Sequence, residues 1–140
     1  MRKIDKIIVH CTATPEGREV TIEEIDSWHK ARGWSQVGYH YLVSLDGKIS
    51  KGRDIEIQGA HCKGENKSSI GVAYSGGCDK DMNAKDTRTE KQKQSLEYLI
   101  GYLSAMFPGS KIFGHRDFST KECPSFDAKS EYKFIEDKYV

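Results

Sequence analysis

Residues 4–10 of the chain read Ile-Asp-Lys-Ile-Ile-Val-His, a short apolar run that ends in a histidine. Consecutive β-branched residues predict a strand that is buried on both faces. In open α/β sheets, ligands collect beyond the carboxyl ends of the strands. His10 stands at such an end. This stretch therefore supplies both a strand of the expected sheet and the first candidate residue for a site.

Helix and strand signals alternate along the rest of the chain. Two capping boxes, Thr21 with Glu24 and Thr89 with Gln92, predict helix starts. Gly33 and the Pro108-Gly109 pair predict where those two helices stop. The other expected strands are 39–44, 48–51, 70–74 and 111–114, and a last helix is expected over 127–138. Alternating strands and helices predict an α/β fold, with one mixed β-sheet flanked by helices in a single domain over residues 1–140.

The expected connections include one tight turn and two long loops. An Asp46-Gly47 turn joins the second and third strands into a hairpin. Residues 52–68 carry charges and glycines and predict a long loop. Residues 76–88 are polar and predict a flexible surface loop.

The composition is that of an ordinary soluble domain. Lys and Arg total 22 against 21 Asp and Glu, which gives a formal net charge of +1. The balance gives no reason to expect a nucleic-acid partner. No apolar stretch approaches the ~20 residues of a membrane span. Four cysteines without a CxxC pair are expected to stay reduced, with two disulfides as the alternative.

Three residues have the chemistry of zinc ligands. His115 follows the expected strand at 111–114, as His10 follows the first, and Cys123 lies eight residues further on. Imidazole and thiolate are ligands that Zn²⁺ prefers, and three protein ligands leave a fourth tetrahedral position open, as in catalytic sites. Five histidines and four cysteines also allow accidental combinations. Spacing alone therefore leaves the choice between ligands and structural residues open.

Seven short motifs, in order along the chain, resemble one known family. They are residues 9–14 (VHCTAT), 38–41 (GYHY), 52–54 (GRD), 59–61 (GAH), 69–72 (SIGV), 114–115 (GH) and 121–127 (KECPSFD). Together they resemble the type-2 N-acetylmuramoyl-L-alanine amidases. This zinc-dependent family includes the bacteriophage T-seven lysozyme and the peptidoglycan recognition proteins. The resemblance implies a central mixed sheet with helices on both faces. It also implies cleavage of the amide between the lactyl group of N-acetylmuramic acid and L-alanine in peptidoglycan.

The resemblance also implies roles for single residues. His10, His115 and Cys123 match the metal ligands, for one Zn²⁺ per chain. Tyr39 and Lys121 match catalytic residues. A zinc-bound water with a pKa of ~7 would attack the amide, and Lys121 or Tyr39 would stabilise the oxyanion. From the residues alone, Lys121 is as readily a solvated loop lysine, and Tyr39 a packed strand aromatic.

The other three histidines lie outside the expected ligand set. His61 lies in the long loop and is expected to line the substrate groove, with an ordinary surface histidine as the alternative. His29, beside Trp28 on a helix, is expected to be structural. His40 alternates with Tyr39 and is expected to face away from the site.

The expected function is that of a phage or prophage-type endolysin that acts on peptidoglycan as a monomer. The N-terminus lacks an apolar h-region, so we expect synthesis in the cytoplasm without a signal peptide and action on the cell wall after release or delivery. The alternatives are a non-catalytic peptidoglycan-binding module and a protein-binding regulator. Retention of Cys123 and Lys121 favours the enzyme.

Overall fold

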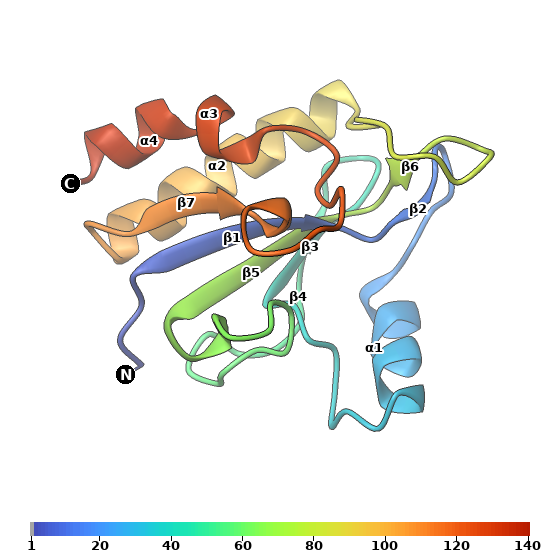
Figure 1. Ribbon diagram of the computed structural model, residues 1–140, viewed down its shortest axis with the longest axis horizontal. Coiled ribbons are helices and arrows are strands. Elements are labelled where there is room, and N and C mark those ends of the chain that lie inside the picture. Colours follow the sequence, from blue (N-terminus) through green and yellow to red (C-terminus); the bar gives the residue numbers. More distant parts are fainter. Residues whose placement is uncertain (1) are drawn as a thin grey trace.

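A mixed five-stranded sheet forms the centre of the molecule (Figure 1). The computed structural model describes residues 2–140. The strand order is β4-β3-β5-β1-β7. Their bounds are β1 Lys6–Cys11, β3 Tyr41–Val43, β4 Ile49–Lys51, β5 Ser69–Tyr74 and β7 Lys111–Gly114. Only β4 runs antiparallel to its neighbour, because β3 and β4 form the hairpin expected at Asp46-Gly47.

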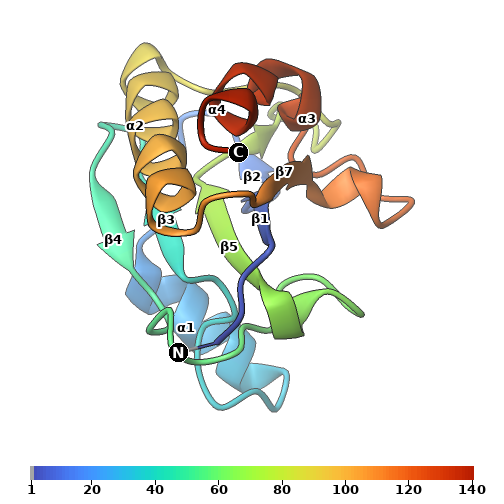
Figure 2. The ribbon, with the colours of Figure 1, turned by 90° about the vertical axis from the view of Figure 1, so that its left-hand side faces the viewer.

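Helices cover both faces of this sheet, as the resemblance implies (Figure 2). Helix α1, Ile22–Ala31, lies on one face. The other face carries α2 (Glu90–Met106), α3 (Ala128–Glu131) and α4 (Lys133–Lys138). Short 3₁₀ turns occur at η1, Asn66–Ser68, and η2, His115–Asp117. The predicted fold class is therefore confirmed.

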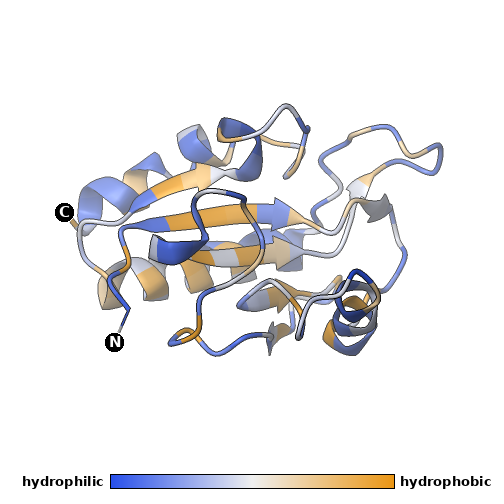
Figure 3. Ribbon diagram, turned by 60° about the horizontal axis from the view of Figure 1, so that its bottom comes forward, coloured by the Kyte–Doolittle hydropathy of each residue, from blue (hydrophilic) through white to orange (hydrophobic). Residues whose placement is uncertain are grey.

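Side-chain alternation along the strands divides the core in two. Ile7 and Val9 of β1 pack toward α2, in the larger cluster of buried residues. Leu42 and Ala73 point the opposite way and pack with Ile25 of α1 in the smaller cluster. The central strands are apolar over their middle residues, whereas the helices have an apolar and a polar side (Figure 3). Both faces of β1, β3 and β5 are buried, which explains their nearly continuous apolar sequences.

The capping residues stand where the sequence places them. Thr89 and Gln92 form the complete reciprocal capping box at the start of α2. At α1 only half of the box forms. The Thr21 hydroxyl accepts from the Glu24 amide, while the Glu24 carboxylate pairs with Arg18 at 2.6 Å. A nearby guanidinium thus competes with the main-chain amide for that carboxylate.

Two expectations need correction. Residues 76–88 are not simply a surface loop, because β6 (Gly77–Cys78) pairs in parallel with β2 (Thr14–Pro15), and Thr87 and Arg88 are buried. The last helix is two short helices that meet at Tyr132. The Tyr132 side chain is buried in the core, where its ring contacts Phe126. Burial of this aromatic side chain interrupts the single helix that the apolar periodicity predicts.

The cysteines are all free thiols, as expected. Among residues 2–140, no helix is long and apolar enough to cross a membrane.

Candidate metal centre

Sheet topology brings His10 and His115 together. Strands β1 and β7 are parallel neighbours, and Val9 is in register with Gly114. The next residue of each strand is a histidine, so both side chains emerge at the same carboxyl edge. Their ring centroids lie 4.6 Å apart. The expectation that two parallel strands would juxtapose these residues is confirmed.

Cys123 reaches the same edge by way of the loop that follows η2. The Tyr74 hydroxyl donates to the Pro124 carbonyl at 2.7 Å, and the Ser125 hydroxyl donates to the Gly77 carbonyl at 2.7 Å. The main-chain N–H of Cys11 donates to Cys123 Sγ at 3.1 Å. These bonds tie the loop to β1, β5 and β6. The thiol is therefore held in place by three separate segments.

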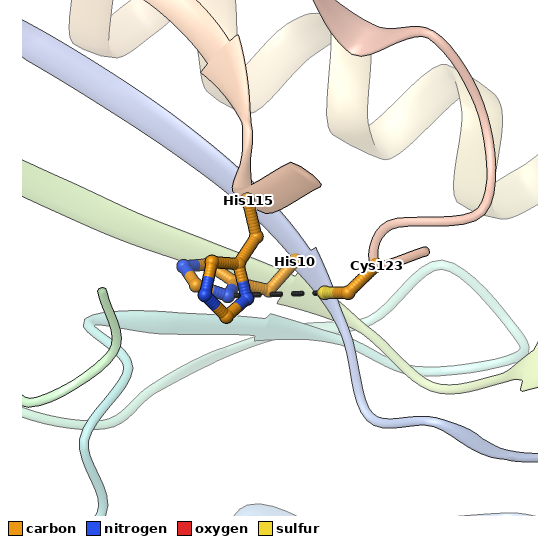
Figure 4. Close-up of side chains that lie close together, drawn as sticks. All are labelled: His10, His115 and Cys123. Carbon is orange, nitrogen blue, oxygen red and sulfur yellow. Dashed lines mark hydrogen bonds between the residues drawn. The ribbon is translucent and has the colours of Figure 1, made fainter. Parts of the chain in front are cut away.

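The three side chains offer one ligand atom each to a common point (Figure 4). These atoms all lie within 4.8 Å of one another. His10 Nδ1 lies 3.9 Å from Cys123 Sγ. In a tetrahedral zinc site with Zn–N of ~2.0–2.1 Å and Zn–S of ~2.3 Å, ligand atoms are about 3.3–3.6 Å apart. Small side-chain movements would therefore complete the geometry, and the donor set fits Zn²⁺.

The electrostatic environment favours the neutral form of both histidines. Burial, followed by the nearby His61 and His115, holds the pKa of His10 well below its ordinary value. Burial and then Lys121 lower the pKa of His115. A neutral imidazole is the form that binds a metal. At neutral pH both rings are therefore ready to act as ligands.

Nearby groups shift the pKa of the Cys123 thiol in opposite directions. The neighbouring Cys11 thiol and burial raise the pKa of the Cys123 thiol, while the Cys11 amide and Lys121 act in the opposite direction. A bound cation deprotonates a coordinating thiol outright. A bound cation would therefore favour the thiolate of Cys123 over the thiol.

Tyr39 lies against the histidine cluster. Its ring centroid is 5.2 Å from that of His10 and 5.5 Å from that of His29. Burial raises the pKa of the Tyr39 hydroxyl above its usual value, so the hydroxyl stays protonated and can donate a hydrogen bond. His29 Nδ1 accepts a hydrogen bond from the Gly38 N–H at 2.8 Å. This bond is consistent with the structural role expected for His29.

A cleft of about 700 Å³ opens beside His115, one of the three candidate ligands. Its walls include the aromatic rings of Trp34 and Phe118 and the cations Arg32, Lys63 and Lys121. Lys121 and its neighbour Glu122 are both exposed. Within the part of the chain that the structure describes, no aspartate or glutamate lines this cleft. The cleft therefore presents aromatic and positively charged groups to a ligand.

His61 lines the cleft and also contacts the candidate ligand His10. It is among the lining residues, yet only 8% of its surface is exposed. Its Nδ1 lies 2.8 Å from His10 Nε2. Burial, with His40 as the next cause, lowers the pKa of His61 to about 3. Sequence reasoning missed the contact with His10, because the position of His61 in a long loop carries no periodicity.

The expectation for His40 is wrong. Its ring lies 5.8 Å from that of His61, on the side of the candidate site. Strand β3 begins at Tyr41, so the alternation that was assumed for Tyr39 and His40 does not apply. The His40 ring is held by Gly71, whose N–H donates to Nδ1, and by the carbonyl of Ile57 at Nε2. Asp127 caps α3 by accepting a hydrogen bond from the Ser130 amide.

Comparisons with known proteins agree with this geometry. Residues 1–126 match the family model of the N-acetylmuramoyl-L-alanine amidases. The endolysin of Klebsiella phage KP32 is 40% identical over 91% of this chain and 85% of its own length. The endolysin of Escherichia phage T7 is 42% identical over 89% of this chain and 83% of its own length.

Solved structures show the same fold. The N-acetylmuramoyl-L-alanine amidase LysC from Clostridium intestinale superposes with a TM-score of 0.80 at 29% identity, over 98% of this chain and 85% of that one. Drosophila PGRP-LB has a TM-score of 0.79 at 23% identity, over 95% of this chain and 81% of that one, and supports the fold alone. The family match over most of the chain, together with relatives near 40% identity, shows that this chain belongs to the N-acetylmuramoyl-L-alanine amidase family.

Proposed function

We propose that residues 1–140 form a single zinc amidase domain that acts as a monomer, like a phage or prophage endolysin. Its reaction is hydrolysis of the amide between the lactyl group of N-acetylmuramic acid and L-alanine in bacterial peptidoglycan. The observation that carries the proposal is the convergence of His10, His115 and Cys123 from three separate segments, in a chain of this family. The protein would meet its substrate in the cell wall after release or delivery from the cytoplasm.

The metal we propose is one Zn²⁺, held by His10, His115 and Cys123. Two imidazoles and one thiolate suit zinc better than magnesium or calcium, which prefer oxygen ligands. Three protein ligands leave one position for water or substrate, as in catalytic zinc sites. When bound, the ion supplies a Lewis acid that polarises the amide carbonyl and makes hydroxide available near neutral pH.

Tyr39 and Lys121 would complete the catalytic site from opposite sides. Tyr39 lies against the His10 ring and keeps its hydroxyl proton, so it would donate a hydrogen bond to the reacting oxygen or orient the attacking water. Lys121 lies in the cleft wall with His115 and would place positive charge beside the developing oxyanion. His61 would form part of the same wall, where the substrate binds.

The composition of the cleft also favours amide over sugar chemistry. Glycosidases usually need two carboxylates that flank the scissile bond. Among the described residues of the cleft there is no such pair. An arrangement of two histidines and a cysteine offers a metal-assisted route to an amide instead. It also favours turnover over mere binding, since a binding module has no need of a complete ligand set.

Digestion of purified sacculi tests the proposal. Intact stem peptides with new L-alanine amino termini should appear, while the glycan strands keep their length and no new reducing ends form. New reducing ends without free peptide amines would identify a glycosidase. Retention of sacculi on the protein without release of any fragment would identify a binding module.

A further inference from the structure

The two ring nitrogens of His10 face different partners. Nδ1 lies toward Cys123 Sγ, at 3.9 Å, whereas Nε2 lies 2.8 Å from His61 Nδ1. A neutral imidazole has one N–H donor and one lone-pair acceptor. If Nδ1 gives its lone pair to a metal, Nε2 must carry the proton, and its N–H donates a hydrogen bond to His61 Nδ1. The opposite tautomer would aim an N–H at the metal and prevent binding.

We propose that His61 is a positioning residue that holds His10 in the tautomer and orientation needed to bind the metal through Nδ1. The inference rests on the proposed zinc site and assigns His61 a role beyond the cleft wall. Residues that accept the second N–H of a ligand histidine fix its ring and increase its basicity. Carboxylates and carbonyls usually act in this way, and here a second imidazole takes their place.

His61 is itself held in a slot that matches this task. Its main-chain N–H donates to Asn66 Oδ1 at 2.9 Å, and its Nε2 lies 3.2 Å from Ser69 Oγ. A Cβ atom added to Gly71 would lie 2.6 Å from the His61 ring, and one added to Gly59 would lie 2.7 Å from it. Glycine at both positions gives the ring space to lie flush with β5. The residue is therefore held at its main-chain N–H and at Nε2, and Gly71 and Gly59 lie close against its ring.

A direct polar contact with substrate fits this geometry less well. Both nitrogens of His61 already have protein partners, His10 and Ser69. A substrate group that bound either nitrogen would have to break one of these bonds. Only carbon atoms of the ring remain free to face the cleft. Its polar chemistry is thus directed inward, toward the ligand His10.

Two substitutions separate the acceptor function from the volume of the ring. His61→Phe fills the slot but removes the acceptor. His61→Asn keeps an acceptor, because the asparagine side-chain oxygen, like Nδ1, is bonded to Cγ. Zinc affinity, measured by competition with a chromophoric chelator, should fall about 10–100-fold in His61→Phe. His61→Asn should recover most of the loss. Unfolding of the metal-free proteins, measured in parallel, separates loss of affinity from loss of fold.

His29→Phe is the matched control. Like His61, His29 is buried, but its Nδ1 accepts a hydrogen bond from the Gly38 N–H and not from a candidate metal ligand. This variant should lose stability but bind zinc like the wild type. An equal loss of zinc affinity in His29→Phe and His61→Phe would overturn the inference, because it would reflect a general packing defect.

A spectroscopic measurement on the wild type keeps the inference testable even if His61→Phe does not fold. Long-range ¹H–¹⁵N correlation spectra of the zinc-loaded protein should show His10 protonated at Nε2 and bound through Nδ1. Binding through Nε2, or unchanged zinc affinity in His61→Phe, would overturn this inference alone. Failure of the wild type to bind zinc would overturn the proposed zinc site together with it.

Discussion

The two sides of the candidate metal centre are built differently. On one side, His10 is 1% exposed and lies against His61, which is fixed by Asn66 and Ser69. On the other side, the loop after η2 carries the partly exposed Cys123 and the exposed side chain of Lys121. Strand β1 and the buried residues packed against its end thus hold one candidate ligand in place. The loop supplies a ligand and a charge that remain accessible to substrate, which is the usual division between scaffold and loop.

Removal of a candidate ligand from either side of the site should have the same effect on metal binding. We expect Cys123→Ala and His10→Ala each to lose the bound zinc and all hydrolysis, because two remaining ligands hold the ion too weakly. Metal analysis and release of peptide amines from sacculi measure the two effects. Cys78→Ala is the control, since Cys78 is also a free thiol but lies outside the ligand set. Full zinc occupancy in Cys123→Ala would rule out this ligand assignment.

Lys121 tests the exposed side alone. Lys121→Ala should fold normally and keep its zinc, but turnover should fall by ~10²–10³-fold, the usual effect of removing one group that stabilises an oxyanion. Lys85→Ala serves as the control, because Lys85 is an exposed lysine whose partner is Glu16 at 3.1 Å. Near wild-type turnover in Lys121→Ala would limit this lysine to binding or solubility.

Tyr39 tests the buried side without touching a ligand. Tyr39→Phe removes only the hydroxyl and leaves the ring against His10, so zinc content and thermal stability should stay near wild type. We expect turnover to fall by no more than the ~10²–10³-fold expected for Lys121, because an ordered water can replace part of a missing hydroxyl donor. Unchanged turnover with zinc bound would mean that Tyr39 serves packing alone.

Gly71 tests how rigid the slot around His61 is. A Cβ at this position would meet the His61 ring at 2.6 Å, so Gly71→Ala should lower the free energy of unfolding by about 1–3 kcal/mol, as overpacking does. Gly101→Ala in α2 is the matched control, since nothing lies within 4 Å of its added Cβ. That change should stabilise the protein by ~0.5–1 kcal/mol. Urea unfolding measures both, and equal stability of the two variants would show that the slot is soft.

Local signals in the sequence predicted much of the fold. The Thr89 capping box and the Asp46-Gly47 turn depend on neighbouring residues only, and both form as expected. The final helix was predicted less well. Its helical period runs through Tyr132, but burial of that side chain against Phe126 divides it. Where packing on distant residues competed with local preference, packing decided the outcome.

By itself, the sequence determined most elements of the fold, the family and the residue types of the candidate site. His10 and His115 could be placed at one edge because strand ends in a parallel sheet follow from local patterns. The hydrogen bond between His10 and His61 was decided by tertiary structure alone. His61 lies in a loop with no period, and Arg2 ties that loop to the rest of the fold by donating to the carbonyls of Ile55 and Ser69. Such contacts join residues far apart in the chain, and no local rule of propensity or spacing encodes them.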